Sequence, residues 1–132
     1  MAERPRIEFN FDMSGSDCFG CGQNNPFGLK LEFKKKDGIV RAEFTPGKAY
    51  QGWSGVLHGG IIASALDEGM GWATKLAGLN AVTARLKVNF KRPVAIGERL
   101  IIIARITRQS GRLVETEAKM TLPDGTPMAE GF

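Results

Sequence analysis

The residues best suited to chemistry lie in one short stretch of the chain. His58, the only histidine, is followed by two glycines and then by a segment with helical periodicity. Asp67 lies nine residues after the histidine, in the middle of that segment. A glycine pair at a helix start leaves backbone N–H groups uncovered, and the helix dipole attracts negative charge to that end. The stretch therefore combines a candidate oxyanion site, from the N–H groups of Gly59 and Gly60, with a candidate base.

These residues also have structural interpretations. A lone histidine before a helix often has its ring satisfied by backbone partners, and His58 has no obvious companions as a metal ligand. Close backbone packing at a crowded helix start would equally explain the two glycines. Asp67 favours the catalytic interpretation over the structural one. Aspartate is unfavourable in the interior of a helix, and Asp67 lies away from the terminal turn where the helix dipole would stabilise it. Its neighbour Glu68 shares a wheel position with polar residues, as expected of a solvated or ion-paired side chain.

The spacing of the two candidate groups constrains how they could act. Gly59 and Asp67 are eight residues apart, which places them about 12 Å apart along one helix. A base and an oxyanion donor must both come within about 3 Å of the reacting atoms. Two antiparallel copies of the helix could bring Gly59 of one subunit to Asp67 of the other across a two-fold axis. If both groups are catalytic, the protein must be a symmetric dimer with two sites at its interface.

The rest of the chain predicts one sheet around this helix. The helix is expected from about 60 to 77, with an apolar stripe at i, i+3, i+4 spacing and Gly78 at its end. Asp37-Gly38 predicts a hairpin turn. Alternating or apolar runs predict strands at 29–33, 39–44, 82–90, 99–106 and 113–120, with a short terminal strand after Asp124-Gly125. The expected class is α+β, an antiparallel sheet of about five to six strands wrapped around one long central helix.

Composition places the chain among ordinary globular proteins. Of its 132 residues 42% are hydrophobic and 24% charged. No apolar run approaches the ~20 residues of a membrane span, and the N-terminus lacks a signal-peptide core. We expect one domain over 1–132 with a loosely ordered arm at 1–17, in the cytoplasm, with neither a membrane nor a nucleic acid as partner. The net charge of +4 comes mainly from two clusters, Lys30, Lys34, Lys35 and Lys36, and Lys87, Lys91 and Arg92, which are either solvated faces or attract a polyanionic small molecule.

The two cysteines form the motif Cys18-Phe-Gly-Cys21. Such a pair can be half of a zinc site or a redox pair. A structural zinc site needs four ligands, and this chain has no second cysteine pair. The turn sequence that follows, residues 22–26, does not match the strand–helix setting of a redox pair. We expect a tight knuckle of two reduced thiols and no bound metal.

Together these motifs resemble a known family. His58-Gly59-Gly60, Asp67 nine residues later, and the strand Val88-Asn-Phe-Lys-Arg-Pro93 are similar to the hotdog-fold acyl-CoA thioesterases, most closely the phenylacetate-type branch. The resemblance covers roughly residues 18–131. It implies that Asp67 activates water or attacks directly, that the Gly59 N–H polarises the thioester carbonyl, and that His58 braces the loop.

The resemblance also implies substrate-binding roles. Gln51 falls where the family often places an amide that contacts the thioester or the water. Thr83 falls where a hydroxyl positions the nucleophilic water. Further candidates are Gly60 at the helix start, Asn24 and Asn25 at the pocket entrance, and Lys91 and Arg92 at the CoA phosphates.

The function expected from this resemblance is hydrolysis of acyl-CoA to a carboxylic acid and CoA by a homodimer or homotetramer. No cofactor is required, since CoA is part of the substrate. Two alternatives on the same fold remain open. One is a non-catalytic module that binds acyl-CoA or lipid, and the other is an acyl-CoA hydratase with His58 as its base.

Overall fold

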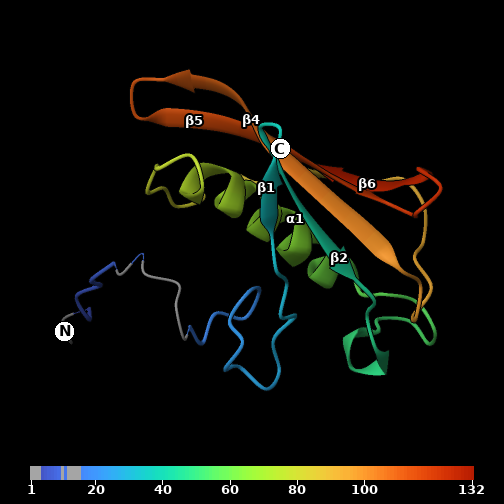
Figure 1. The fold of residues 1–132 in the computed structure, drawn as a ribbon. Helices are drawn as coiled ribbons and strands as arrows, with labels where there is room; N and C mark the ends of the chain where they lie inside the picture. The colour runs from blue at the N-terminus through green and yellow to red at the C-terminus, as the bar shows by residue number, and fades with distance from the viewer. Residues whose placement is uncertain (1–3, 10, 12–15) are drawn as a thin grey trace.

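The computed structural model describes residues 4–9, 11 and 16–132. Within this part of the chain, six strands form one antiparallel sheet and a long helix lies against one of its faces (Figure 1). The strand order is β1-β2-β4-β5-β6-β3. The elements are β1 (Lys34–Lys36), β2 (Ile39–Phe44), η1 (Lys48–Tyr50), α1 (Gly59–Lys75), β3 (Val88–Phe90), β4 (Leu100–Ser110), β5 (Leu113–Thr121) and β6 (Pro127–Gly131). The expected α+β class, with one helix on an antiparallel sheet, is confirmed.

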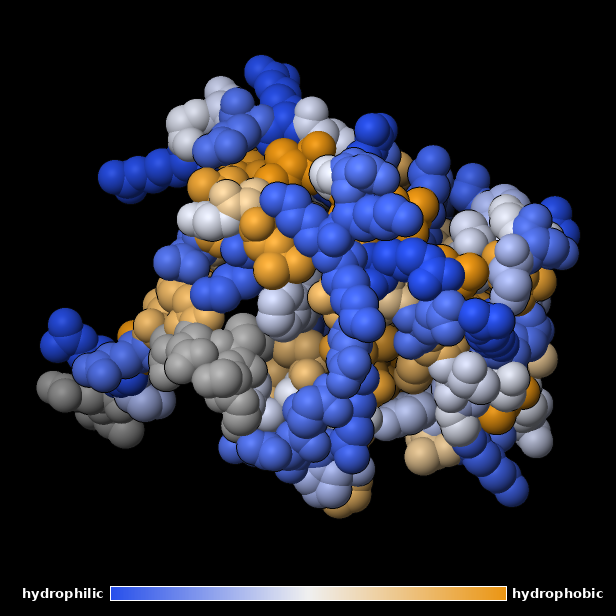
Figure 2. Space-filling model, in the orientation of Figure 1, coloured by the Kyte–Doolittle hydropathy of each residue, from blue (hydrophilic) through white to orange (hydrophobic). Residues whose placement is uncertain are grey.

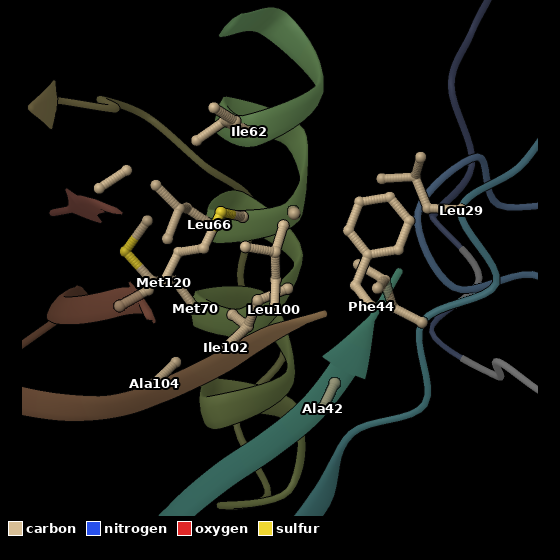
Figure 3. Close-up of a cluster of buried hydrophobic side chains, with 14 of the residues drawn as sticks. Leu29, Ala42, Phe44, Ile62, Leu66, Met70, Leu100, Ile102, Ala104 and Met120 are labelled. Atoms are coloured by element: carbon tan, nitrogen blue, oxygen red, sulfur yellow. The ribbon is translucent and has the colours of Figure 1, made fainter. Parts of the chain in front are cut away.

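The helix is the element that the sequence predicted best. It begins one residue before the expected start and ends two residues before the expected end. Gly78 follows in the turn after it, with a φ of 81° that favours glycine. Its buried face is the predicted apolar stripe, and Gly69 on that face allows close approach to Ala104 of β4. Figure 3 shows this stripe packed on the sheet, where the fully buried side chains include Leu66, Leu100, Ile102 and Met120.

The first hairpin has the predicted turn but not the predicted strand. Asp37 and Gly38 both have positive φ, 52° and 79°, as a two-residue hairpin turn requires. The strand before it is Lys34–Lys36 rather than 29–33. Leu29 and Leu31 are buried as the alternation predicted, but their N–H groups donate to Phe19 and Gly20 at 2.8 and 3.0 Å, outside the sheet. The alternation of apolar and polar residues at 29–33 therefore reflects side chains that pack on the core, in a segment that pairs with no strand of the described residues.

The strand predicted at 82–90 is also shorter than expected. Only Val88–Phe90 pairs with β6, in a register that joins Val88 to Gly131. Lys87 and Phe132 extend this ladder by two backbone hydrogen bonds, of 3.0 and 2.9 Å. Within the described residues, 82–86 pair with no strand. These residues form an exposed segment at the sheet edge.

The remaining strands confirm the expectation. β4 and β5 form a long hairpin with a register shift between Ile106 and Arg108, and β6 is the short terminal strand. The expected arm at 1–17 lies partly outside the described residues, and residues 4–9 contain neither helix nor strand. In the ranges that the structure does describe, no helix is both long enough and apolar enough to cross a membrane.

The two edges of the sheet differ in character. β1 consists of three exposed lysines, and a hydrophilic band crosses the middle of the face drawn in Figure 2. Lysines on an edge strand discourage pairing with another chain. The other edge, formed by β3 and the segment before it, exposes the apolar side chains of Val82, Leu86 and Phe90.

Candidate active site

His58 caps the start of α1. Its backbone is extended, with φ −63° and ψ 133°, and its ring Nδ1 accepts a hydrogen bond from the Gly60 N–H at 2.8 Å. Its own N–H donates to the Tyr50 carbonyl at 2.9 Å. Because Nδ1 is an acceptor here, the proton of the neutral ring is on Nε2. His58 thus connects the preceding loop to the first turn of the helix.

The capping bond distinguishes the two glycines. The Gly60 N–H is used by His58, whereas the Gly59 N–H makes no hydrogen bond to any described residue. Gly59 lies beside the Phe90 ring, since a Cβ at this position would stand 3.5 Å from two ring carbons. An uncovered N–H at the first helical position is a donor suited to an oxyanion.

Asp67 and Thr83 are brought together across sixteen residues of sequence. The Thr83 hydroxyl donates to Asp67 Oδ1 at 2.7 Å. Thr83 comes from the exposed segment before β3, and Asp67 is half-buried on α1. Among the described residues no cation forms an ion pair with Asp67. The carboxylate is therefore fixed by one hydroxyl and keeps its second oxygen for another partner.

Asp67 and Thr83 line a cleft of about 680 Å³ between α1, the segment before β3 and the start of β5. Gly71 lies in the same wall, and a Cβ there would meet nothing within 4 Å. The apolar part of the lining includes Met70, Val82, Leu113, Val114 and Phe132. Three cations, Arg85, Lys87 and Arg112, complete the wall. A long amphipathic ligand with anionic groups matches this lining.

The cleft does not contain the oxyanion donor. Gly59 and His58 are absent from its lining. Because α1 is continuous from Gly59 to Lys75, the rise per residue separates Gly59 from Asp67 by about 12 Å. A single copy of the chain therefore presents the base and the donor at two different places.

Gln51 and Asn25 form hydrogen bonds within their own loops. Gln51 Oε1 accepts from the Gly55 N–H at 3.1 Å and so fixes the turn before the helix. Asn25 Oδ1 accepts from the Phe27 N–H at 2.9 Å, and its amide donates to the Asp17 carbonyl at 3.1 Å. Neither residue lines the cleft.

Lys91 and Arg92 also lie outside the cleft lining. Lys91 pairs with Glu130 at 3.6 Å, and the N–H groups of both residues donate to the Met128 carbonyl. Arg85 and Arg112 were not among the binding residues predicted from the sequence. Arg85 lies two residues before Lys87 in the same alternating run, so the sequence could have placed both cations on one face. Arg112 follows a turn glycine, and only the fold brings it to the cleft.

Glu68 differs from the expectation of a solvated side chain. It is half-buried under the cysteine loop, where Cys18 Sγ donates to its Oε1 at 3.3 Å. Burial raises the pKa of Glu68 above its usual range, with a further contribution from the Asp67 charge, while hydrogen bonds from Cys18 and Cys21 oppose the rise. The helical wheel was misleading because the loop at 16–28 covers this side of α1.

Comparisons with known proteins agree with this architecture. A family model for the thioesterase superfamily matches residues 54–129. The acyl-coenzyme A thioesterase THEM4 of Bos taurus is 38% identical over 110 residues, covering 82% of this chain and 45% of that protein. The chain thus spans about half the length of this curated relative.

Two solved structures extend the comparison. The crystal structure of a thioesterase superfamily protein aligns with 97% of this chain, and the alignment covers 70% of that protein's chain. The TM-score is 0.82 and the sequence identity is 27%. The structure of a hypothetical thioesterase protein from Streptococcus pneumoniae, solved with coenzyme A, aligns with 76% of this chain, and the alignment covers 82% of that protein's chain. Its TM-score is 0.72 and its identity 20%, a likeness of fold. The hotdog fold expected from the resemblance is confirmed.

Proposed function

Because this chain belongs to the thioesterase superfamily, we propose that it hydrolyses acyl-CoA to a carboxylic acid and free CoA. The observation that carries this proposal is the Thr83–Asp67 hydrogen bond of 2.7 Å inside the cleft. It supplies a fixed carboxylate base next to a space that can hold a thioester. The CoA-bound structure with the same fold and the bovine thioesterase support CoA esters as the substrate class.

In the proposed reaction Asp67 acts as a general base. It takes a proton from a water molecule, whose oxygen forms a bond to the thioester carbon. The negative charge that develops on the carbonyl oxygen is stabilised by the N–H of Gly59 from a second subunit. When the C–S bond breaks, the proton on Asp67 passes to the departing CoA sulfur. Thr83 holds the base in position, and the steps require no cofactor.

The proposed homodimer joins at the β3 edge. That edge exposes Val82, Leu86 and Phe90, and no strand of the described residues pairs with residues 82–86. The opposite edge is protected by the lysines of β1. A two-fold axis near the β3 edge would set two copies of α1 antiparallel, with each Gly59 facing the partner's cleft. Pairs of such dimers would give the alternative tetramer.

The cleft wall suggests how the substrate is arranged. Arg85, Lys87 and Arg112 form the cationic part of the wall and are proposed to bind the phosphates of CoA. The apolar part of the lining, which includes Met70 and Val114, is proposed to hold the acyl chain. Lys91 and Arg92, which lie outside this lining, remain candidates only for the phosphates at the dimer edge.

The proposal is tested by measuring CoA release with a thiol reagent for short-chain, long-chain and aryl acyl-CoAs. We expect turnover that saturates with substrate and is strongest for one of these acyl classes. Saturable binding of acyl-CoA without release of thiol would contradict hydrolysis and would identify a non-catalytic binding module. Addition of water across an enoyl-CoA double bond without thiol release would identify a hydratase.

A further inference from the structure

A second group of chemically active side chains lies outside the cleft. Cys18, Cys21 and Glu68 place one sulfur or carboxylate oxygen each within 4.8 Å of one another. Cys21 is buried, and Cys18 and Glu68 are half-buried. Neither cysteine forms a disulfide. None of the three lines the cleft or takes part in the proposed hydrolysis.

The loop that carries the cysteines is built to approach α1 closely. The Gly22 N–H donates to the Cys18 carbonyl at 2.9 Å, which closes a tight turn around the two sulfurs. A Cβ at Gly20 would overlap the Glu68 side chain, and a Cβ at Gly22 would overlap the backbone of Cys18. The glycines of the Cys-Phe-Gly-Cys-Gly sequence therefore allow both thiols to reach the carboxylate of the helix.

The cluster contains acidic groups without a counter-charge. Cys21 is buried and Glu68 half-buried, and Cys18 Sγ donates to Glu68 Oε1 at 3.3 Å. In the part of the chain that the structure describes, no lysine or arginine forms an ion pair with Glu68. A bound divalent cation would replace the protons of these groups and supply the missing positive charge.

We propose that Cys18, Cys21 and Glu68 form a binding site for Zn²⁺, with a water molecule in the fourth position. Two sulfur ligands favour zinc over magnesium or calcium, which prefer oxygen. Both thiols, and the carboxyl where it is protonated, release their protons to solvent when the metal binds. The half-exposed position of Cys18 leaves room for the water ligand.

This proposal departs from the sequence-based expectation of no metal. That expectation counted only cysteine and histidine, and Glu68 lies fifty residues after Cys18 in the sequence. The fold supplies the third ligand. The bound metal would fasten the loop at 16–28 to the helix residue next to Asp67, which couples the N-terminal segment to the element that carries the proposed base.

The proposal is tested by metal binding to the whole chain, and activity is not the readout. We expect protein purified under reducing conditions to contain about one zinc per chain. After chelation, added Co²⁺ should produce the thiolate charge-transfer absorption and the visible bands of a tetrahedral site. Cys21→Ser and Cys18→Ser should lose the charge-transfer band in proportion to the sulfurs removed, and Glu68→Gln should weaken Co²⁺ binding at least about tenfold.

Asp67→Asn is the matched control, because it removes the adjacent carboxylate and leaves the three ligands in place. It should bind Co²⁺ like the unchanged protein. Circular dichroism verifies the fold of each variant, and Cys18→Ser, at the less buried cysteine, serves if Cys21→Ser does not fold. The proposal is overturned if Co²⁺ gives no thiolate charge-transfer band, or if both serine variants keep that band. It is also overturned if protein purified under reducing conditions has a mass two hydrogens below that of the chain with free thiols, because that mass indicates a disulfide.

Discussion

Replacing Asp67 with asparagine is expected to lower kcat for acyl-CoA hydrolysis by about 10²–10⁴-fold, the usual contribution of a general base. Asparagine keeps the size of the side chain and an oxygen that can accept the Thr83 hydrogen bond. It cannot take a proton from water at neutral pH. The melting temperature should therefore change little while turnover is lost, and thiol release at saturating substrate measures the effect.

Glu115 provides a control for the loss of charge, because it is a second carboxylate in the lining of the same cleft. Glu115→Gln removes one negative charge without removing the proposed base, and it should keep most of the activity. If Asp67→Asn kept full turnover, or if the two variants lost activity equally, Asp67 would not be the base.

Replacing Gly59 with proline is expected to lower kcat by about 10²–10³-fold, the loss found when one oxyanion donor is removed. Proline has no backbone N–H, and the first helical position is where helices accept it best. The extended backbone of His58, with ψ 133°, is also the conformation preferred before proline. The helix should form normally, as circular dichroism can verify, while the donor is absent.

Gly59→Ala is the matched control, since alanine adds a side chain but keeps the N–H. A Cβ at this position meets the Phe90 ring at 3.5 Å, which is ordinary contact. Alanine should therefore retain far more activity than proline. Equal losses in the two variants would mean that space at Gly59, rather than its N–H, is what the reaction needs.

The helix could be predicted from sequence because its signals are local. Its apolar stripe, its histidine cap and Gly78 all act within one or two turns. For a different reason, the strand at 29–33 was predicted wrongly and the strand at 82–90 was predicted too long. Alternation reports which side chains are buried, but a strand also needs a neighbour to pair with. Leu31 bonds to the cysteine loop instead, and in the described residues β6 pairs with Val88–Phe90 but with none of residues 82–86.

The residues of the candidate site also fall into two groups, those that local sequence predicts and those that depend on contacts between distant segments. The spacing of Gly59 and Asp67 lies within one helix, so the sequence was enough to separate them by about 12 Å. The resemblance already implied Gly59 as the donor, and the hydrogen bond from the Gly60 N–H to the His58 ring gives a physical reason that the sequence does not show. Arg112 and Glu68 depend on contacts between distant segments. No periodicity in the sequence records those contacts.

The central claim is that each active site takes Asp67 from one subunit and Gly59 from the other. Asp67→Asn and Gly59→Pro subunits carrying different affinity tags can be unfolded together, refolded and isolated as mixed dimers. In such a dimer one site carries both changes and the other carries neither. Random mixing makes about half of the dimers mixed, so the refolded pool should recover about a quarter of the unchanged activity. If sites were complete within one subunit, every site would carry one change, and isolated mixed dimers no more active than either variant alone would contradict the account.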